Sequence, residues 1–383
     1  MTSFLKSAAL VALCALASCT KPLETASYSV VPLPSEVTPS EGTPFRLNSR
    51  TSVFYPTGNA LLKRNAEFLS EYVAQSMNFA LPVREQAEGE APEHAITLVL
   101  DSTINNEEGY RLSVTEKSIR IEGRTEQGIF YGIQTLRKSL PAVAESKSIL
   151  LPAAVVNDEP RFTYRAMHLD VCRHFFPVEF VKKYIDLLAL HNMNTFHWHL
   201  TDDQGWRIES KKYPKLNEIG SVRHRTVVGY LGSGEYDNTD YGGYYTQEQM
   251  KEVVAYAAER YINVLPEIDL PGHTLSVLAS YPEFGCTGGP YEVCPDWGVF
   301  PDVLCIGNEQ AMQFVEDILG ELIEIFPSRY IHIGGDEAPR VRWKNCPKCQ
   351  KRIAEEGLRA GGGFTAEDRL QSYCMQRAER FLN

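Results

Sequence analysis

The chain has 383 residues, of which 43% are hydrophobic and 23% charged, and its formal net charge is −11. This length and composition allow a sizeable core and two domains. They argue against nucleic acid as a partner, because the basic residues are not clustered and phosphate binding requires a concentrated basic face.

The first segment, residues 1–18, is predicted to be an export signal and not part of the fold. Lys6 precedes an apolar run over 8–17, far shorter than the ~20 residues of a membrane span. The segment ends in Leu16-Ala17-Ser18-Cys19, which resembles the bacterial lipobox, where cleavage precedes a lipid-modified cysteine. We therefore expect a lipid anchor on Cys19, a tether over 19–26 and, because no Asp follows Cys19, an outer-membrane location. The alternative is an ordinary signal peptide with a chance cysteine.

Seven cysteines remain beyond the export segment, an odd number that leaves at least one unpaired thiol. For an exported protein, a disulfide within Cys286, Cys294 and Cys305 is one expectation. Cys346 and Cys349 have the CxxC spacing of a redox or zinc site, but no second CxxC or nearby pair of histidines completes a zinc set. The sequence therefore favours a local loop staple or two free thiols there.

Residues 27–158 mix short strands with helices and are predicted to form a small α+β domain. Apolar residues recur at helical spacing over 60–78, and a second helix is predicted over 125–139. Strands are predicted over 95–100, 107–114 and 119–122. No residue pattern in this region suggests chemistry.

Residues 159–383 have a different rhythm, in which strand and helix alternate four times. Strands are predicted over 166–171, 194–200, 262–268 and 330–334, and helices over 178–191, 246–260, 309–326 and 366–382. This alternation predicts parallel strands with crossover helices. A (β/α)₈ barrel and an open α/β sheet both place chemistry at the carboxyl ends of their strands, but no glycine-rich phosphate loop follows the first strand.

Two adjacent acids, Asp336 and Glu337, follow the last predicted strand after two glycines. Neighbouring carboxylates in a partly dry site cannot both ionise freely, so one tends to hold its proton near neutral pH. A held proton beside an ionised acid is the equipment for breaking a glycosidic bond. The alternative is a solvated pair at the start of a helix, where acids favour the helix dipole.

Polar side chains also follow the other predicted strands. His197 and His199 alternate along one strand and so share a face; with Asp202 and His273 they could form a metal site, or they could be packed core histidines. Glu267 and Asp269 share a face of the next strand, and the turn after it can return His273 over the strand end. Arg173 offers a planar fork of donors that suits sugar hydroxyls or a carboxylate.

Four segments, 170–177, 197–207, 266–273 and 332–337, closely resemble glycoside hydrolase family 20, the β-N-acetylhexosaminidases, and they occur in the family's order. Residues 128–136 resemble part of the small domain that precedes the barrel in that family. The resemblance implies an exo-acting enzyme that removes terminal N-acetylglucosamine or N-acetylgalactosamine from glycans by substrate-assisted, retaining hydrolysis.

The resemblance also implies roles for individual residues. Glu337 would be the general acid and base, and Asp336 would orient the 2-acetamido group of the substrate. Arg173 would hold sugar hydroxyls. Asp202 and His273 would line the substrate site as a network around Glu337, with Asp269 and His199 supporting them. This chemistry needs no metal and no cofactor.

The pattern departs from the family in one respect. Only four strand–helix units are visible, whereas a closed barrel needs eight. We therefore expect the first half of a (β/α)₈ barrel, and we expect these 383 residues alone to be inactive. A metal-dependent barrel hydrolase and a sugar-binding lipoprotein without catalysis remain as alternatives.

Overall fold

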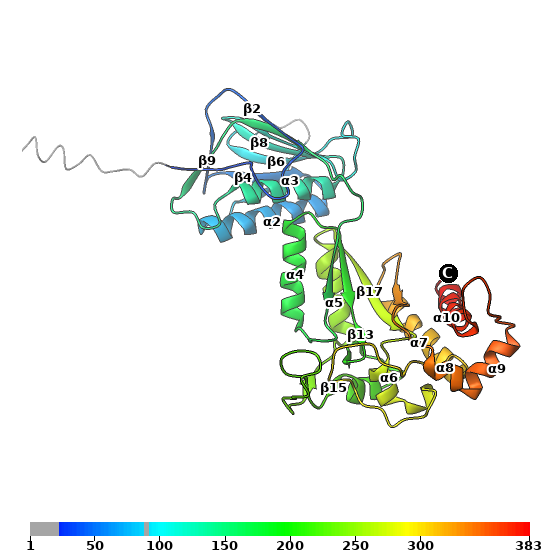
Figure 1. The fold of residues 1–383 in the computed structure, drawn as a ribbon. Helices are drawn as coiled ribbons and strands as arrows, with labels where there is room; N and C mark the ends of the chain where they lie inside the picture. The colour runs from blue at the N-terminus through cyan, green and yellow to red at the C-terminus, as the bar shows by residue number, and fades with distance from the viewer. Residues whose placement is uncertain (1–22, 88–91) are drawn as a thin grey trace, which may run out of the picture. The chain divides into compact units, whose positions relative to one another are not determined.

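The computed structural model describes residues 23–87 and 92–383 (Figure 1). The predicted export signal, Cys19 and the first part of the tether lie outside the described residues. The chain divides into two compact units, one ending at Arg161 and one beginning at Phe162, here called the N-terminal and C-terminal units. No described helix is both long enough and apolar enough to cross a membrane.

The N-terminal unit contains a seven-stranded mixed sheet in the order β2-β10-β7-β8-β6-β4-β5 and a three-stranded sheet in the order β1-β9-β3. Helices α2 and α3 pack side by side against the larger sheet (Figure 1). The elements are β1 (Glu24–Thr25), β2 (Glu36–Pro39), β3 (Phe45–Asn48), β4 (Ser52–Pro56), α2 (Ala60–Met77), β5 (Val83–Gln86), β6 (Ala95–Leu100), β7 (Tyr110–Val114), β8 (Ser118–Gly123), α3 (Glu126–Ser139), β9 (Ser148–Leu151) and β10 (Ala154–Asp158).

Side-chain caps set the start of both helices of this unit, and a glycine lets one of them pack closely. The side chains of Asn59 and Thr125 cap α2 and α3 by accepting N–H groups of the first turn. Gly128 brings α3 close to the loop before β7, because a Cβ there would lie 2.3 Å from the carbonyl oxygen of Gly109. The result is a continuous apolar core that carries no cluster of reactive groups among those described in this unit.

The C-terminal unit is built on four parallel strands in chain order: β11 (Ala166–Asp170), β12 (Thr195–His199), β17 (Asn263–Leu270) and β18 (His332–Gly334). The long helices are α4 (Val178–Leu190), α5 (Gln247–Ala258), α7 (Glu309–Ile325) and α10 (Ala366–Leu382). The predicted alternation of strand and helix is present. Neighbouring strands that follow one another in the chain are typical of a barrel and not of a doubly wound sheet, but the described strands do not close into a barrel.

Shorter elements lie in the loops of this unit. They are β13 (Thr201–Asp202), β14 (Gly205–Trp206), η1 (Leu216–Gly220), β15 (Val222–Arg223), β16 (Tyr241–Gly242), α6 (Leu275–Ser280), η2 (Pro282–Phe284), α8 (Val341–Asn345) and α9 (Pro347–Glu355).

The two faces of the four-stranded sheet differ in chemistry. Phe196 and Trp198 are fully buried on the helix side, where the Trp198 ring contacts Tyr245 and Phe326. Because side chains alternate along a strand, the residues between them, such as His197, point to the other face. That face is lined by histidines and acids from all four strands, and it leads to the strand ends where the site lies.

Candidate active site

The last residue of β18 and the three residues that follow it, Gly334–Glu337, are here called the acid turn. Gly334 and Gly335 have φ angles of +65° and +112°, and Glu337 has φ +41°, which is uncommon for a residue with a side chain. A Cβ at Gly334 would lie 2.4 Å from Asp269 Oδ1, so only glycine allows β18 to end this close to β17. The turn leaves Asp336 and Glu337 exposed, with 54% of the Glu337 side chain accessible.

His273 connects the acid turn to buried carboxylates. Its Nε2 lies 3.3 Å from Glu337 Oε2, and its Nδ1 lies 3.3 Å from Asp202 Oδ1 and 3.2 Å from Asp203 Oδ2. Hydrogen bonds to Asp202 and Asp203 outweigh burial and raise the pKa of His273 to about 11. The ring is therefore a buried imidazolium that directs one N–H to this pair of acids and the other to Glu337.

The acids of the turn are close to this cation and to each other. One oxygen from each of Asp336 and Glu337 and one ring nitrogen of His273 all lie within 4.8 Å of one another. Two carboxylates flanking a water molecule in an inverting glycosidase are ~6.5–9.5 Å apart, so this pair is too close for that arrangement.

Arg173 is a second fixed cation at the strand ends. Its Nη2 lies 2.6 Å from Asp202 Oδ2, and its Nη1 lies 3.0 Å from Asp170 Oδ2. Burial alone would lower the pKa of Arg173, but Asp202 and Asp170 raise it. Asp202 is completely buried, and this burial raises its pKa although His273 and Arg173 act in the opposite direction. Asp202 thus joins the two cations and has no surface of its own for a ligand.

His199 and Asp269 form a buried pair below these residues. His199 Nε2 lies 3.0 Å from both Asp269 Oδ2 and the carbonyl oxygen of Thr201. Burial would lower the pKa of His199, but the hydrogen bond to Asp269 and the nearby acids raise it to about 9. Asp269 Oδ1 also lies 2.4 Å from where a Cβ at position 334 would be. The pair therefore leaves room only for glycine at the start of the acid turn.

A further group on the same face, here called the histidine layer, consists of Glu267 with His168, His197 and His332. Glu267 Oε2 lies 2.7 Å from His197 Nε2, and Oε1 lies 2.8 Å from His332 Nδ1. Burial would raise the pKa of Glu267, but these histidines hold it below its ordinary value. His197 and His199 share a face as predicted, and both lie near Glu267, but the acid closer to His199 is Asp269. Among the described residues, no group of ligand atoms within 4.8 Å of one another contains both histidines, so the metal site suggested by the sequence is not favoured.

Two positioning residues were not assigned a role from the sequence. Asp203 shares His273 with Asp202 and also accepts the N–H of Leu275 at 2.9 Å. The fully buried Arg207 donates to the carbonyl oxygens of Val171, Cys172, Ser221 and Gly243. Both residues lie in the motif segment 197–207, but a buried arginine that binds only backbone leaves no pattern in the sequence.

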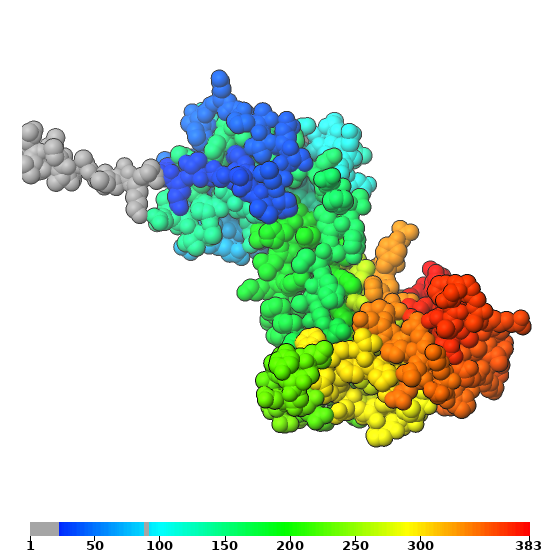
Figure 2. All heavy atoms as spheres, in the orientation of Figure 1, coloured from blue at the N-terminus to red at the C-terminus, as the bar shows by residue number. Residues whose placement is uncertain are grey.

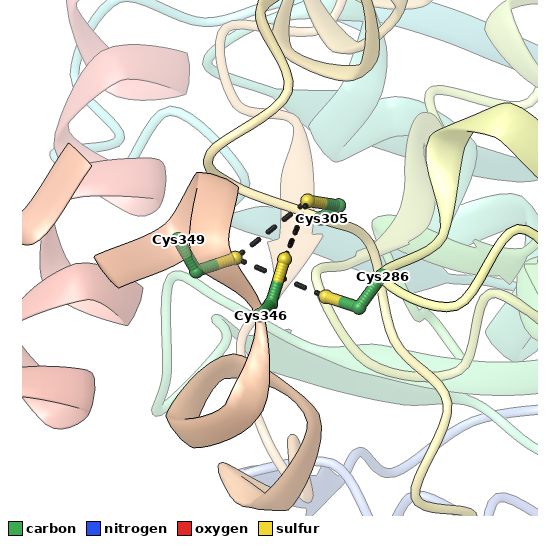
Figure 3. Close-up of side chains that lie close together, drawn as sticks. All are labelled: Cys286, Cys305, Cys346 and Cys349. Carbon is green, nitrogen blue, oxygen red and sulfur yellow. Dashed lines mark hydrogen bonds between the residues drawn. The ribbon is translucent and has the colours of Figure 1, made fainter. Parts of the chain in front are cut away.

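The cysteines correct the sequence prediction. All seven are free thiols, so the expected disulfide within Cys286, Cys294 and Cys305 is absent. Cys286 and Cys305 instead lie beside Cys346 and Cys349, and the four sulfur atoms are within 4.8 Å of one another (Figure 3). Cys346 and Cys349 are free thiols, one of the two alternatives that the sequence favoured, and the two cysteines beside them come from another loop, which no spacing in the sequence indicated.

Comparisons with known proteins agree with this architecture. Residues 162–383 match the model of the glycosyl hydrolase family 20 catalytic domain, and residues 27–159 match that of glycosyl hydrolase family 20, domain 2. The chain therefore belongs to glycoside hydrolase family 20, whose solved structures combine a small N-terminal domain with a (β/α) barrel.

Individual relatives give the extent of the similarity. The chain is 41% identical to a β-hexosaminidase of Porphyromonas gingivalis over 361 residues, covering 92% of this chain and 44% of the relative. It is 36% identical to a β-hexosaminidase of Vibrio furnissii, covering 94% and 56%. The structure of exo β-N-acetylglucosaminidase from Vibrio harveyi in complex with N-acetylglucosamine matches with a TM-score of 0.78 at 30% identity, covering 94% and 54%. The chain thus spans about half the length of the curated relatives it matches.

Proposed function

We propose that this protein is an exo-acting β-N-acetylhexosaminidase that removes terminal N-acetylglucosamine or N-acetylgalactosamine from glycans by substrate-assisted, retaining hydrolysis. The observation that carries the proposal is the acid turn. Asp336 and Glu337 are exposed there next to a buried imidazolium, while the other strand-end acids already bind cations. The resemblance to glycoside hydrolase family 20 supports the substrate's own acetamido oxygen as the nucleophile, with Asp336 orienting that group.

In the first step, Glu337 gives its proton to the glycosidic oxygen as the bond from that oxygen to the anomeric carbon breaks. The acetamido oxygen forms a new bond to the anomeric carbon, giving a cyclic oxazolinium ion. The Asp336 carboxylate accepts the acetamido N–H and stabilises the positive charge that develops on nitrogen. Water then gives a proton to Glu337 and attacks the anomeric carbon, which reopens the ring and retains the configuration.

The buried network prepares the acid for this role. His273 Nε2 lies 3.3 Å from Glu337 Oε2 and fixes the position of that carboxyl group. Arg173 is held in place by Asp170 and Asp202 and can bind adjacent hydroxyls of the terminal sugar with its remaining donors. Asp202, Asp203, Asp269 and His199 act as positioning residues.

The experiment uses the protein as its gene encodes it and compares two aryl substrates that differ only at carbon 2. An aryl N-acetyl-β-glucosaminide should be hydrolysed about 10³-fold faster or more than the matching β-glucoside, because the second substrate lacks the internal nucleophile. Asp336→Asn should slow only the first substrate. Equal rates on both substrates, or an unchanged rate in Asp336→Asn, would contradict the substrate-assisted scheme.

We also propose that the four parallel strands are the first half of an eight-stranded barrel and that these 383 residues alone are inactive. The share of the relatives that is covered, 44% and 56%, supports this proposal. An assay of the purified 383-residue chain on the aryl N-acetyl-glucosaminide tests it, and robust turnover would refute the inactivity.

For localisation, we propose export and lipid attachment at Cys19, with the protein held at the outer membrane. The support is the segment Leu16–Cys19. Cells that express the protein should incorporate labelled palmitate into it, and Cys19→Ala should abolish the label and release the protein from the membrane fraction. Unlabelled wild-type protein would overturn the proposal.

A further inference from the structure

Four cysteines from two distant segments meet in the C-terminal unit and are here called the cysteine cluster: Cys286, Cys305, Cys346 and Cys349. The first two lie in the loop between β17 and α7, and the other two lie at the start of α9. Figure 3 shows their sulfur atoms turned toward a common centre. Cys305 Sγ lies 3.6 Å from the sulfurs of both Cys346 and Cys349, and Cys286 Sγ lies 3.8 Å from Cys349 Sγ.

We propose that the cysteine cluster binds one Zn²⁺ ion as a structural Cys₄ site. Thiolates bind zinc in a tetrahedron with Zn–S bonds of ~2.3 Å, so neighbouring sulfurs are about 3.8 Å apart. The three sulfur–sulfur distances of 3.6–3.8 Å match the edges of that tetrahedron. The equal distances from Cys305 Sγ to two other sulfurs fit four ligands around one centre better than separate disulfide pairs, in which each sulfur has one close partner at ~2.05 Å.

The backbone around the cluster is built for close approach. Gly307 lies directly against the CxxC segment, because a Cβ there would be 2.1 Å from the carbonyl carbon of Lys348. The backbone N–H groups of Gly307 and Asn308 also approach the sulfurs of Cys349 and Cys305. Such N–H groups complete the surroundings of metal-bound thiolates by sharing their negative charge.

Burial makes this a closed site. Cys305 and Cys349 are fully buried and Cys346 is 3% exposed, while Cys286 is partly accessible. Four protein ligands around a tetrahedral ion leave no open position for water or substrate, which distinguishes a structural zinc site from a catalytic one. The metal therefore takes no part in the hydrolytic step proposed above.

The cluster joins the loops that carry the two halves of the acid site. Figure 2 shows the yellow residues after β17 lying against the orange residues after β18. Around the cluster, Trp343 Nε1 donates to the carbonyl oxygen of Leu304 at 2.9 Å, and Arg342 Nε lies 2.8 Å from Asp302 Oδ1. The Leu304 N–H in turn donates to the carbonyl oxygen of Pro271 at 3.0 Å, two residues before His273. Zinc would thus clamp the His273 turn to the segment that follows Glu337.

The experiment measures metal and thiols in the protein as its gene encodes it, purified without a metal-affinity tag. Elemental analysis should give one zinc per chain. Cys305→Ser and Cys349→Ser should lose that equivalent, whereas Cys294→Ser should keep it, because Cys294 lies in the same loop outside the cluster and is also buried.

The rival explanation is that the cluster forms two disulfides, which an oxidising compartment would favour. A thiol titration of denatured wild-type protein, with chelator and without reductant, distinguishes the two. Zinc predicts that all seven cysteines of residues 172–374 react. Unreactive thiols at the four cluster cysteines, protein without metal, or the visible charge-transfer absorbance of an iron–thiolate centre would each overturn the assignment. Because neither readout uses turnover, failure here would leave the proposed hydrolase activity untouched.

Discussion

The two units of this chain use their sheets in opposite ways. In the N-terminal unit, the described buried polar side chains are uncharged, among them Asn65, Gln134 and Thr135, and the core is apolar. In the C-terminal unit, one face of the sheet carries His199, Glu267 and Asp269, each paired with a group of opposite charge. Burying a charged group costs free energy unless the group is paired. Charged groups gathered on one face of a sheet therefore indicate a functional site and not a contribution to stability.

The largest contrast should come from the acid itself. In the protein as its gene encodes it, Glu337→Gln removes the proton that the leaving group needs and should lower kcat by about 10²–10⁴-fold on substrates with poor leaving groups, with little change in folding. Glu324→Gln, an exposed glutamate of α7, is the matched control and should be neutral. Steady-state kinetics of both variants tests this prediction. A normal kcat in Glu337→Gln would show that Glu337 is not the general acid.

The next effect is conformational. Gly334→Ala places a Cβ 2.4 Å from Asp269 Oδ1 at a φ of +65°, and it should lower the free energy of unfolding by about 1–3 kcal/mol while displacing the acid turn. Gly320→Ala in α7 is the control, since its Cβ meets only Phe381 at 3.8 Å. The control should stabilise the protein by about 0.4–1 kcal/mol. Equal stabilities of the two variants, measured by urea unfolding, would argue against the tight approach of β18 to β17.

The buried cations predict a pH dependence of stability. His273 has its pKa raised from 6.5 to about 11, so its contribution is complete below about pH 6.5 and is lost as the pH rises toward 11. The free energy of unfolding should therefore fall above pH 6.5 by up to about 1.4 kcal/mol per pH unit. His273→Gln should flatten this slope, whereas His224→Gln, with 85% of that side chain exposed, should not. Identical slopes in wild type and His273→Gln, measured by urea unfolding between pH 7 and 9, would contradict a buried imidazolium.

The smallest effect belongs to the N-terminal unit. Tyr110→Phe removes a buried hydroxyl that lies 2.7 Å from Thr135 Oγ1 and 3.1 Å from Asp158 Oδ2. It should cost about 1 kcal/mol of stability and leave kcat unchanged. Tyr230→Phe, at a side chain that is 75% exposed, should change neither quantity. A large loss of kcat in Tyr110→Phe would show that the N-terminal unit takes part in chemistry.

The sequence predicted the strand-end residues well because parallel strands end at one edge of a sheet. Arg173, Asp202, His273 and Glu337 come from segments far apart in the chain, yet they form one connected set of contacts. Predicted helices also matched closely, and the last one, Ala366–Leu382, begins where expected because Thr365 and Asp368 form a capping box at its first turn.

What the sequence did not reveal depends on loops and on long-range pairing. Cys286 and Cys305 reach Cys346 and Cys349 only through the path of an irregular loop, for which no periodicity exists. The histidine layer was missed for a related reason. The sequence did not show which strand acid the histidines contact, because the contact of Glu267 with His332 depends on the register between β17 and β18. Pairing across strands is set by tertiary packing, which a single sequence does not display.

The most direct test of the central claim is the anomeric configuration of the first product, followed by NMR during hydrolysis of an aryl N-acetyl-β-glucosaminide by the protein as its gene encodes it. If the substrate's own acetamido group attacks and Glu337 serves as acid and then base, the β-anomer appears first and the α-anomer arises only by slow mutarotation. Initial release of the α-anomer would contradict the account.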